Sequence, residues 1–311
     1  MASILVTGIT GQDGSYLRER LVAQGHDVHG LVRAGEQPHL PGVTVHRGDL
    51  AEAGAVSAVL RAVEPDVVYN LGGISSVAMS WRKPALTARV SGAAVAEILS
   101  ALRDQQDRTG RPVRFLQASS AEIFGAPTSA PQDETTPLRP VSPYGAAKAF
   151  AHQLVQVFRG AGLHASTVIL YNHESPRRPE SFVTRKITAA AARIAREGGT
   201  VALGNLDAER DWGWAPDYVD AMVRAVEHDE PGDYVVATGV ARSVRDFVRA
   251  AFARAGIEDW EAHVEIDPRY FRPNDAPLLV GDAARARAVL GWVPSVTFEE
   301  VVSRMVEADL G

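Results

Sequence analysis

Short apolar runs alternate with longer stretches of helical periodicity through the first half of the chain, and this alternation constrains the fold most. Each run is rich in Val, Ile, Leu or Phe and is bounded by Gly, Pro or a charged residue, as buried strands usually are. Strand–helix alternation of this kind indicates an α/β protein with a doubly wound parallel sheet. We expect strands at residues 3–7, 27–32, 43–47, 66–70, 113–118 and 164–171. We expect helices at residues 15–25, 53–65, 85–106 and 144–161.

The second half of the chain has a different character. Prolines cluster after about residue 172, and helical stretches at 183–197, 243–256 and 298–308 are separated by loops with few evident strands. We therefore expect residues 1–171 to form the main domain. Residues 172–311 should form a smaller, mainly helical lobe that is partly interleaved with it.

Composition excludes several classes of protein. The formal net charge of the 311 residues is −6, and no dense Lys/Arg tract suggests nucleic-acid binding. The chain has no cysteine, so it has no disulfides or thiolate metal sites, which is consistent with a reducing cytoplasm. Its histidines lack metal-ligand spacing, and we expect no metal. No uninterrupted apolar stretch approaches the roughly 20 residues of a membrane span. We expect a soluble cytoplasmic protein.

A glycine-rich turn, "TGITGQDG", follows the first expected strand. Gly8, Gly11 and Gly14 permit a tight turn and close backbone approach, and the next helix then presents free N–H groups to a pyrophosphate. Glycines in such a turn also serve merely to pack a helix on a strand. Their position in the first strand–turn–helix unit of the chain favours a dinucleotide site.

Residues at the ends of the next strands bear on the choice of cofactor. Sites selective for NAD usually carry an acidic residue about 20 positions beyond the glycines. Here the second strand ends at Arg33 with no carboxylate, which favours the 2′-phosphate of NADP, although NAD remains possible and an ordinary surface arginine is the alternative. Asp49 follows the third strand and is placed to reach the adenine. The "NLGG" segment at 70–73 brings flexible backbone under the cofactor.

Two segments should bring reactive side chains to the carboxyl edge of the sheet. The fifth strand runs into "ASSAEIFG", which carries Ser120 and Glu122. The helix that begins near residue 142 presents Tyr144 and Lys148 one turn apart, on the same face. A lysine cation and an oxidised nicotinamide stabilise a phenolate, so Tyr144 is a candidate general base. The same spacing occurs by chance in many surface helices, but the glycine turn and the serine-bearing strand end favour a reductase-type core.

These residues resemble the extended short-chain dehydrogenase/reductases that act on nucleotide sugars, and in particular their GDP-mannose 4,6-dehydratase branch. The resemblance covers almost the whole chain. It is carried by "VTGITGQDGSYL", "YNLGG", "QASSAEIFG", "SPYGAAK", "NHESPRR", "FVTRKI" and "GNLDAERDWG". It implies a Rossmann-type fold that binds NADP. The implied cofactor residues are Gly8, Thr10, Gly11, Gln12, Asp13, Gly14, Arg33, Asp49, Leu50, Leu71, Gly72, Tyr144 and Lys148.

The resemblance also implies a reaction on GDP-mannose or a related nucleotide sugar. Tyr144 would remove the C4 hydroxyl proton as hydride passes to the cofactor, with Ser120 holding the reacting oxygen. Glu122 would take the C5 proton and donate a proton as the C6 hydroxyl leaves as water. The hydride would then return to C6, with no net redox change. The alternatives are a related epimerase, 4-keto reductase or dehydratase for another sugar, and a non-catalytic dinucleotide-binding regulator.

The substrate site is likewise implied by resemblance. Its residues would be Ser75, Asn172, Val183, Lys186, Arg210, Arg272 and Asp275. Arg177, Arg178 and Arg185 are equally basic, but structural pairing with carboxylates such as Glu174 and Glu180 is the alternative for them.

The chain departs from the family pattern at two informative places. Ser120 stands where the family has threonine, which retains the hydroxyl. The long arginine-bearing loop that follows Arg33 in the family and helps to form a tetramer is shortened here to "AGEQPHLPG". We therefore expect a homodimer.

Overall fold

The computed structural model describes residues 1–271 and 278–311. Its centre is a seven-stranded sheet with the order β10-β6-β5-β4-β1-β2-β3, in which every pair of neighbours is parallel. The strands are β1 (Ser3–Thr7), β2 (Asp27–Val32), β3 (Val43–Arg47), β4 (Val67–Asn70), β5 (Arg114–Ala118), β6 (His164–Leu170) and β10 (Asp233–Val236). The expected doubly wound parallel sheet is confirmed, and the order reverses between β1 and β4 as in other such folds.

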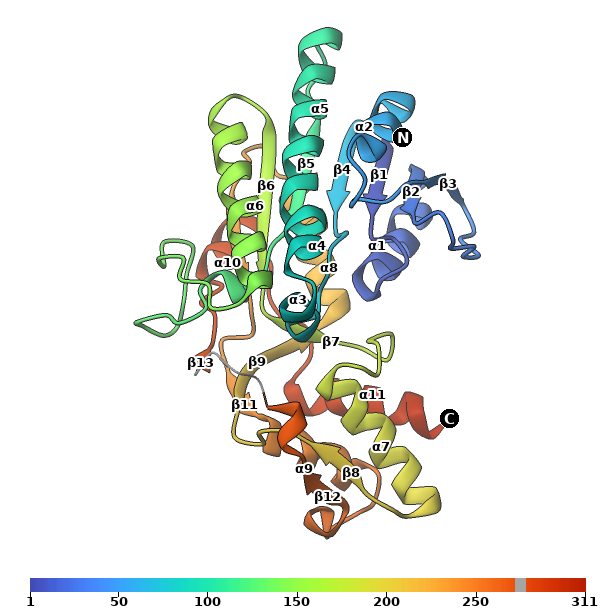
Figure 1. The fold of residues 1–311 in the computed structure, drawn as a ribbon, viewed down its shortest axis with the longest axis vertical. Coiled ribbons are helices and arrows are strands. Elements are labelled where there is room, and N and C mark those ends of the chain that lie inside the picture. Colours follow the sequence, from blue (N-terminus) through green and yellow to red (C-terminus); the bar gives the residue numbers. More distant parts are fainter. Residues whose placement is uncertain (272–277) are drawn as a thin grey trace.

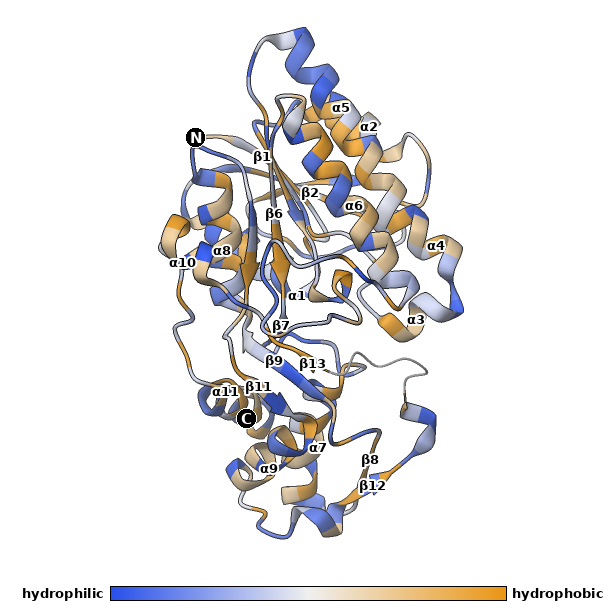
Figure 2. Ribbon diagram, turned by 90° about the vertical axis from the view of Figure 1, so that its left-hand side faces the viewer, coloured by the Kyte–Doolittle hydropathy of each residue, from blue (hydrophilic) through white to orange (hydrophobic). Residues whose placement is uncertain are grey.

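Helices cover both faces of this sheet (Figures 1 and 2). On one face lie α1 (Gln12–Ala23) and α8 (Ala215–Glu227), which pack against each other. On the other face lie α2 (Ala55–Val63), α5 (Ala94–Thr109) and α6 (Pro143–Gly160). Apolar side chains of the strands are buried between these layers, which is why the strands read as nearly continuous apolar runs.

The expected helix at 85–106 is interrupted. It consists of α4 (Pro84–Ala88), a π-helical turn η1 (Arg89–Ala93) and α5. At this turn a Cβ on Gly92 would lie 3.2 Å from the ring of Phe150, so η1 and α6 approach closely there. The helical run Pro84–Thr109 is long and apolar enough to cross a membrane by length and composition alone. Its larger apolar side chains Val95, Ile98, Leu99 and Leu102 are buried in the core of the first domain.

A second core lies beyond the carboxyl edge of the sheet. Helices α7 (Val183–Glu197), α9 (Val244–Arg254) and α11 (Phe298–Leu310) surround a cluster that includes Trp212 and Phe247. Short strands accompany them, although the sequence shows few evident strands there. They are β7 (Asn172–Glu174), β8 (Val201–Leu203), β9 (Glu209–Trp214), β11 (Ala241–Ser243), β12 (Val264–Ile266) and β13 (Leu278–Leu279).

Parts of the second half of the sequence return to the main sheet. Strand β10 pairs with β6, and α8 and α10 (Ala284–Leu290) pack beside them. The indole of Trp292 donates to the carbonyl of Asp217 at 2.7 Å, which fixes the chain after α10 onto α8. The chain therefore passes between the two cores several times, and each connecting segment is anchored at one end in the first core and at the other end in the second.

Candidate active site

The turn between β1 and α1 has two positions that only glycine can fill, Gly8 and Gly14. Gly8 has a positive φ of 70°, and a Cβ there would lie 2.8 Å from the amide nitrogen of Gly72. A Cβ on Gly14 would lie 2.2 Å from the carbonyl oxygen of Gly8. Gly11 is the N-cap of α1 and has no side chain to satisfy the first N–H groups of the helix. The turn therefore leaves a side-chain-free cradle of N–H donors, which fits a pyrophosphate.

Several other expected cofactor residues gather around this turn. Thr10 is exposed within it. The amide of Leu71 donates to the carbonyl of Thr7 at 3.3 Å, which ties the end of β4 to the end of β1. A side chain on Gly72 would lie 2.6 Å from Leu50, so the segment after β3 also reaches this point.

Two polar residues lie at the ends of the adjoining strands. The Asp49 carboxylate accepts from the amide of Ala51 at 2.8 Å and so shapes the loop after β3. Arg33 follows β2 with 73% of its side chain exposed, and its Nε donates to Glu36 at 2.8 Å. A surface pair of this kind contributes little, so the guanidinium can exchange Glu36 for a phosphate at small cost.

Tyr144 and Lys148 lie in the first turns of α6. Ser142 caps this helix by accepting from the amide of Gly145 at 3.0 Å, and Pro143 stands in its first turn. Both functional side chains are buried, and the Lys148 ammonium lies 6.0 Å from the centre of the Tyr144 ring. The expected one-turn spacing thus brings the two groups to one face.

The segment after β5 brings Ser120 and Glu122 to the same place. It forms a short 3₁₀ helix, η2 (Ala121–Ile123), in which the Ser120 hydroxyl accepts from the amide of Glu122 at 3.3 Å. A Cβ on Gly145 would lie 2.4 Å from the carbonyl oxygen of Glu122. This backbone contact holds Glu122 next to the turn that carries Tyr144, and the Ser120 hydroxyl lies close enough to the phenol to influence its pKa.

Burial dominates the electrostatics of the site. It raises the pKa of Tyr144 to about 12, although the hydrogen bond from Ser120 opposes this, and the negative charge of Glu122 adds to it. Burial also lowers the pKa of Lys148 to about 8, against the attraction of Asp13. The phenol is thus protonated and the ammonium charged at neutral pH, and a further positive charge near Tyr144 is needed to make it a base.

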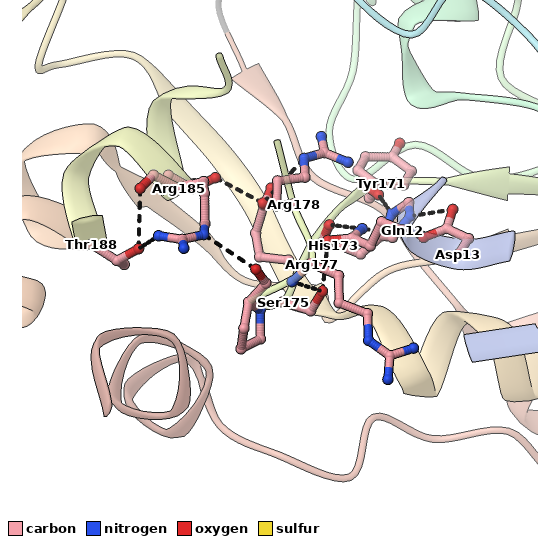
Figure 3. Close-up of polar contacts among 12 residues, drawn as sticks. Gln12, Asp13, Tyr171, His173, Ser175, Arg177, Arg178, Arg185 and Thr188 are labelled. Carbon is pink, nitrogen blue, oxygen red and sulfur yellow. Dashed lines mark hydrogen bonds and ion pairs between the residues drawn. The ribbon is translucent and has the colours of Figure 1, made fainter. Parts of the chain in front are cut away.

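Figure 3 shows a second cluster, which joins the cofactor turn to the loop after β6. His173 Nδ1 faces the carbonyl oxygen of Tyr171 at 2.7 Å, and its Nε2 faces an Asp13 carboxylate oxygen at 2.9 Å. Both partners accept hydrogen bonds, so only the doubly protonated imidazolium satisfies both contacts. Burial opposes both charges, but their mutual attraction prevails, raising the pKa of His173 and lowering that of Asp13. The ring also stacks on Tyr218, with centres 4.5 Å apart.

Further contacts join the same two segments, the glycine turn and the loop after β6. The Gln12 amide donates to the carbonyl of His173 at 3.1 Å and accepts from the Ser175 hydroxyl at 2.9 Å. Arg177 pairs with Glu19 of α1 at 3.0 Å. Gln12 and Asp13, expected as cofactor residues, therefore direct their side chains to the loop after β6, which leads into the second lobe.

Arg178 and Arg185 are also held by carboxylates. Arg178 pairs with Glu174 at 3.3 Å, and Arg185 pairs with Asp309 of α11 at 2.5 Å. With the pair made by Arg177, these contacts agree with the structural alternative for the three arginines.

The expected substrate residues are distributed over the second lobe and its approach. Lys186 donates to the carbonyl of Ala202 at 2.6 Å and lies 3.7 Å from the centre of the Tyr270 ring. Arg210 is buried in β9, and its guanidinium donates to the carbonyl of Glu209 at 2.6 Å.

The remaining substrate residues lie at element ends. Asn172 begins β7 beside Trp212, Val183 begins α7, and Ser75 is exposed just before α3 (Val77–Arg82). Arg272 and Asp275 lie outside the described residues.

Sequence reasoning missed the role of His173. It considered the histidines only as metal ligands and found no suitable spacing. The "NHESPRR" motif gave a local signal, but the partner of His173 lies 160 residues earlier, in a different motif. No short-range pattern connects the two.

Comparison with known proteins defines the class to which this fold and site belong. The putative epimerase of Burkholderia cenocepacia has the same fold, with a TM-score of 0.85 and 28% identity over 99% of this chain and 98% of that one. UDP-glucose 4-epimerase of Thermus thermophilus, solved in complex with NAD, gives a TM-score of 0.86 and 27% identity over 99% of each chain. The protein is thus a Rossmann-type member of the short-chain dehydrogenase/reductase class.

Sequence relatives define the family within that class. The profile of the GDP-mannose 4,6 dehydratase family matches residues 5–305. GDP-mannose 4,6 dehydratase 1 of Arabidopsis thaliana is 46% identical over 98% of this chain and 89% of that protein. The GDP-mannose 4,6 dehydratase of Homo sapiens is 41% identical over 98% of this chain and 91% of that protein. The chain belongs to the GDP-mannose 4,6-dehydratase family, and the expected resemblance is confirmed.

Proposed function

We propose that this protein is an NADP-dependent hydro-lyase that converts GDP-mannose to GDP-4-keto-6-deoxymannose and water. The observation that supports it most directly is the contact of η2 with the first turn of α6. It brings a phenol, a hydroxyl and a carboxylate from two segments to one side of the cofactor turn. A simple C4 oxidation or epimerisation has no use for the carboxylate, whereas loss of water needs an acid–base group for C5 and C6.

The chain's own residues divide the proton transfers between them. Tyr144 takes the proton of the C4 hydroxyl, and the Ser120 hydroxyl holds the same oxygen. Lys148 keeps a positive charge beside the phenol and orients the nicotinamide ribose. Glu122 takes the C5 proton, made acidic by the C4 ketone, and a proton from Glu122 leaves with the C6 hydroxyl as water. Bound NADP supplies the hydride acceptor for C4 and the hydride donor for C6.

The proposed cofactor site uses the glycine cradle. Gly8, Gly11 and Gly14 let the backbone approach the pyrophosphate, and free N–H groups at the start of α1 bind it. Arg33 binds the 2′-phosphate after it releases Glu36. NAD remains the alternative, because an exposed arginine with a single carboxylate partner does not exclude it. The diphosphate of the sugar nucleotide would meet Arg210 and Lys186 in the second lobe.

The test uses GDP-mannose that carries deuterium at C4. The wild-type protein should form a 4-keto product with the deuterium at C6 and no lasting rise in reduced nicotinamide. Glu122→Gln should still oxidise C4 but not eliminate water, so reduced nicotinamide should accumulate to about one equivalent per site. Glu258→Gln changes an exposed glutamate before the 3₁₀ helix η3 (Trp260–His263) and should behave as wild type.

Two results would refute this assignment. Unchanged turnover by Glu122→Gln would remove Glu122 from the mechanism. A C4 epimer in place of a 4-keto product would favour the epimerase alternative.

We further propose that the protein is a homodimer built on α4 and α6. A groove of about 520 Å³ between them is lined by small and apolar residues, including Ala88, Gly92 and Ala147. Phe150, which lines this groove, is 48% exposed, and Val157, seven residues further along α6, is 64% exposed. Apolar surface on one helix face usually marks an interface, and a second copy offers the complementary ridge.

We also propose a role for each part of the chain and a cellular location. We assign residues 1–171 to NADP binding and residues 172–311 to the nucleotide sugar, with the returning segments completing the first sheet. The complete lack of cysteine supports a cytoplasmic location.

A further inference from the structure

A buried row of polar side chains crosses the carboxyl ends of three central strands. Thr7 and Asn70 are the last residues of β1 and β4, Gln117 is the next-to-last residue of β5, and the register places the three side by side. At most 1% of each residue is exposed. The Thr7 hydroxyl donates to Asn70 Oδ1 at 2.6 Å, and Asn70 Nδ2 donates to Gln117 Oε1 at 2.8 Å. Apolar side chains would fill the same space without the free-energy cost of burying two amides and a hydroxyl. The presence of the polar side chains therefore needs a reason.

The row ends at the candidate catalytic lysine. Gln117 Nε2 donates to the carbonyl oxygen of Ala118 at 2.8 Å. The Lys148 ammonium donates to the same oxygen, also at 2.8 Å. A carbonyl oxygen has two lone pairs, so it can accept from both. The last amide of the row therefore presents a donor, with its partial positive charge, beside the ammonium.

The other end of the row lies in the loop under the cofactor turn. The amide of Gly72 donates to Thr7 Oγ1 at 2.9 Å. A hydroxyl has one proton, so Thr7, while it accepts from Gly72, directs that proton to Asn70. Each amide then has its oxygen toward β1 and its nitrogen toward Lys148. The N–H group of Gly72 thus orients every hydrogen bond of the row from donor to acceptor.

We propose that Thr7, Asn70 and Gln117 are positioning residues that fix the ammonium of Lys148 and connect it to the cofactor loop at Gly72. The importance of Lys148 for turnover rests on the proposed function, but the link itself is a property of the protein alone. If the Thr7 hydroxyl is lost, Asn70 and Gln117 are free to rotate their amides. The oxygen of Gln117 then faces the ammonium, which holds its proton more tightly.

Other charges near Lys148 do not depend on the row. Asp13 reaches it from α1, and Tyr144 lies one turn away on its own helix. The loop after β4 contributes Gly73, where a Cβ would lie 3.7 Å from Nζ, and this residue does not titrate. Burial lowers the pKa of Lys148 to about 8, so its titration is accessible to measurement.

The composition of the chain makes the test direct. The sequence has three lysines, Lys83, Lys148 and Lys186. Lysine labelled with carbon-13 at Cε therefore gives three NMR signals, and Lys148→Met identifies the one from Lys148. We expect Thr7→Val to raise the pKa of Lys148 by about one unit in the cofactor-free protein. The other two lysines serve as internal references.

Matched variants separate this effect from a loss of packing. Thr167 lies beside Gln117 at the same level of the sheet, and its buried hydroxyl has no hydrogen-bond partner among the residues that the structure describes. Thr167→Val should leave the titration of Lys148 unchanged, and Thr7→Ser should restore the wild-type value. If Thr7→Val does not fold, Gln117→Met removes the final donor and should give the same upward shift.

Failure of this inference is distinguishable from failure of the proposed function. The inference is wrong if Thr7→Val leaves the pKa of Lys148 at the wild-type value, or if Thr167→Val shifts it equally. The proposed function is tested separately by 4-keto product formation. Where turnover is present, the alkaline limb of its pH profile should move upward in Thr7→Val and stay in place in Thr167→Val.

Discussion

Removal of His173 tests whether its contact with Asp13, which joins the glycine turn to the loop after β6, is an ion pair. In His173→Leu, the carboxylate of Asp13 keeps its place but loses its charged partner. Removing one member of a buried pair costs about 3–5 kcal/mol. The Asp13 side chain is 19% exposed, so water screens part of the charge, and we expect the lower end, about 3 kcal/mol. At roughly 2 °C per kcal/mol for a chain of this length, the Tm should fall by about 6 °C.

The pH dependence of this loss identifies the imidazolium. The raised pKa of His173 means that its contribution is complete below the unfolded value of about 6.5 and is lost as pH rises through the folded value. The lowered pKa of Asp13 means that its contribution is present above about 3.9 and is lost as pH falls through the folded value. The difference in Tm between wild type and His173→Leu should therefore be largest in mildly acidic solution and shrink at alkaline pH.

The assay is thermal unfolding across this pH range for wild type, His173→Leu, Asp13→Asn and the double variant. In Asp13→Asn the ring can be neutral, because Nδ1–H still donates to the carbonyl of Tyr171 and the new amide N–H can donate to Nε2. This variant should therefore cost only about 1 kcal/mol. The two changes should be clearly non-additive, because they remove the same interaction. His263→Leu is the control, since this ring contacts one carbonyl near η3 and no carboxylate at hydrogen-bond distance among the described residues. A loss in His173→Leu that is small and independent of pH would refute the imidazolium assignment.

Three further predictions concern other parts of the molecule. Gly14→Ala should abolish measurable NADPH binding by fluorescence titration and lower the Tm, because the new Cβ would lie 2.2 Å from the carbonyl of Gly8; unchanged binding would move the cofactor away from this turn. Phe150→Glu should convert the dimer to a monomer in analytical ultracentrifugation, whereas a wild-type protein that is already monomeric would contradict the proposed interface. Burial and the charge of His29 lower the pKa of His46, so its contribution to stability is complete above about pH 6.5 and is lost as pH falls below it. His46→Asn should therefore flatten the fall in Tm between neutral and mildly acidic pH, and an equal slope in both proteins would count against this contribution.

Local sequence determined much of the first domain. Six strands of the central sheet were evident as short, largely apolar runs, because burial on both faces leaves little room for polar residues in a central strand. The glycine turn and the spacing of Tyr144 and Lys148 were evident for the same reason, since a tight turn and one helical turn are short-range geometries. Strand β10 is as long as β4 but lies in the second half of the chain, where no strand–helix alternation marks it. Most strands of the second lobe have only two or three residues, too few to show a pattern.

Only the tertiary structure decided which distant residues meet. The sheet order differs from the chain order, so Thr7, Asn70 and Gln117 become neighbours although they come from three separate segments. The pairing of Asp13 with His173 likewise requires the chain after β6 to return to the first helix. Periodicity encodes which face of an element is buried, but partners across the sheet depend on strand order and on how the helices pack.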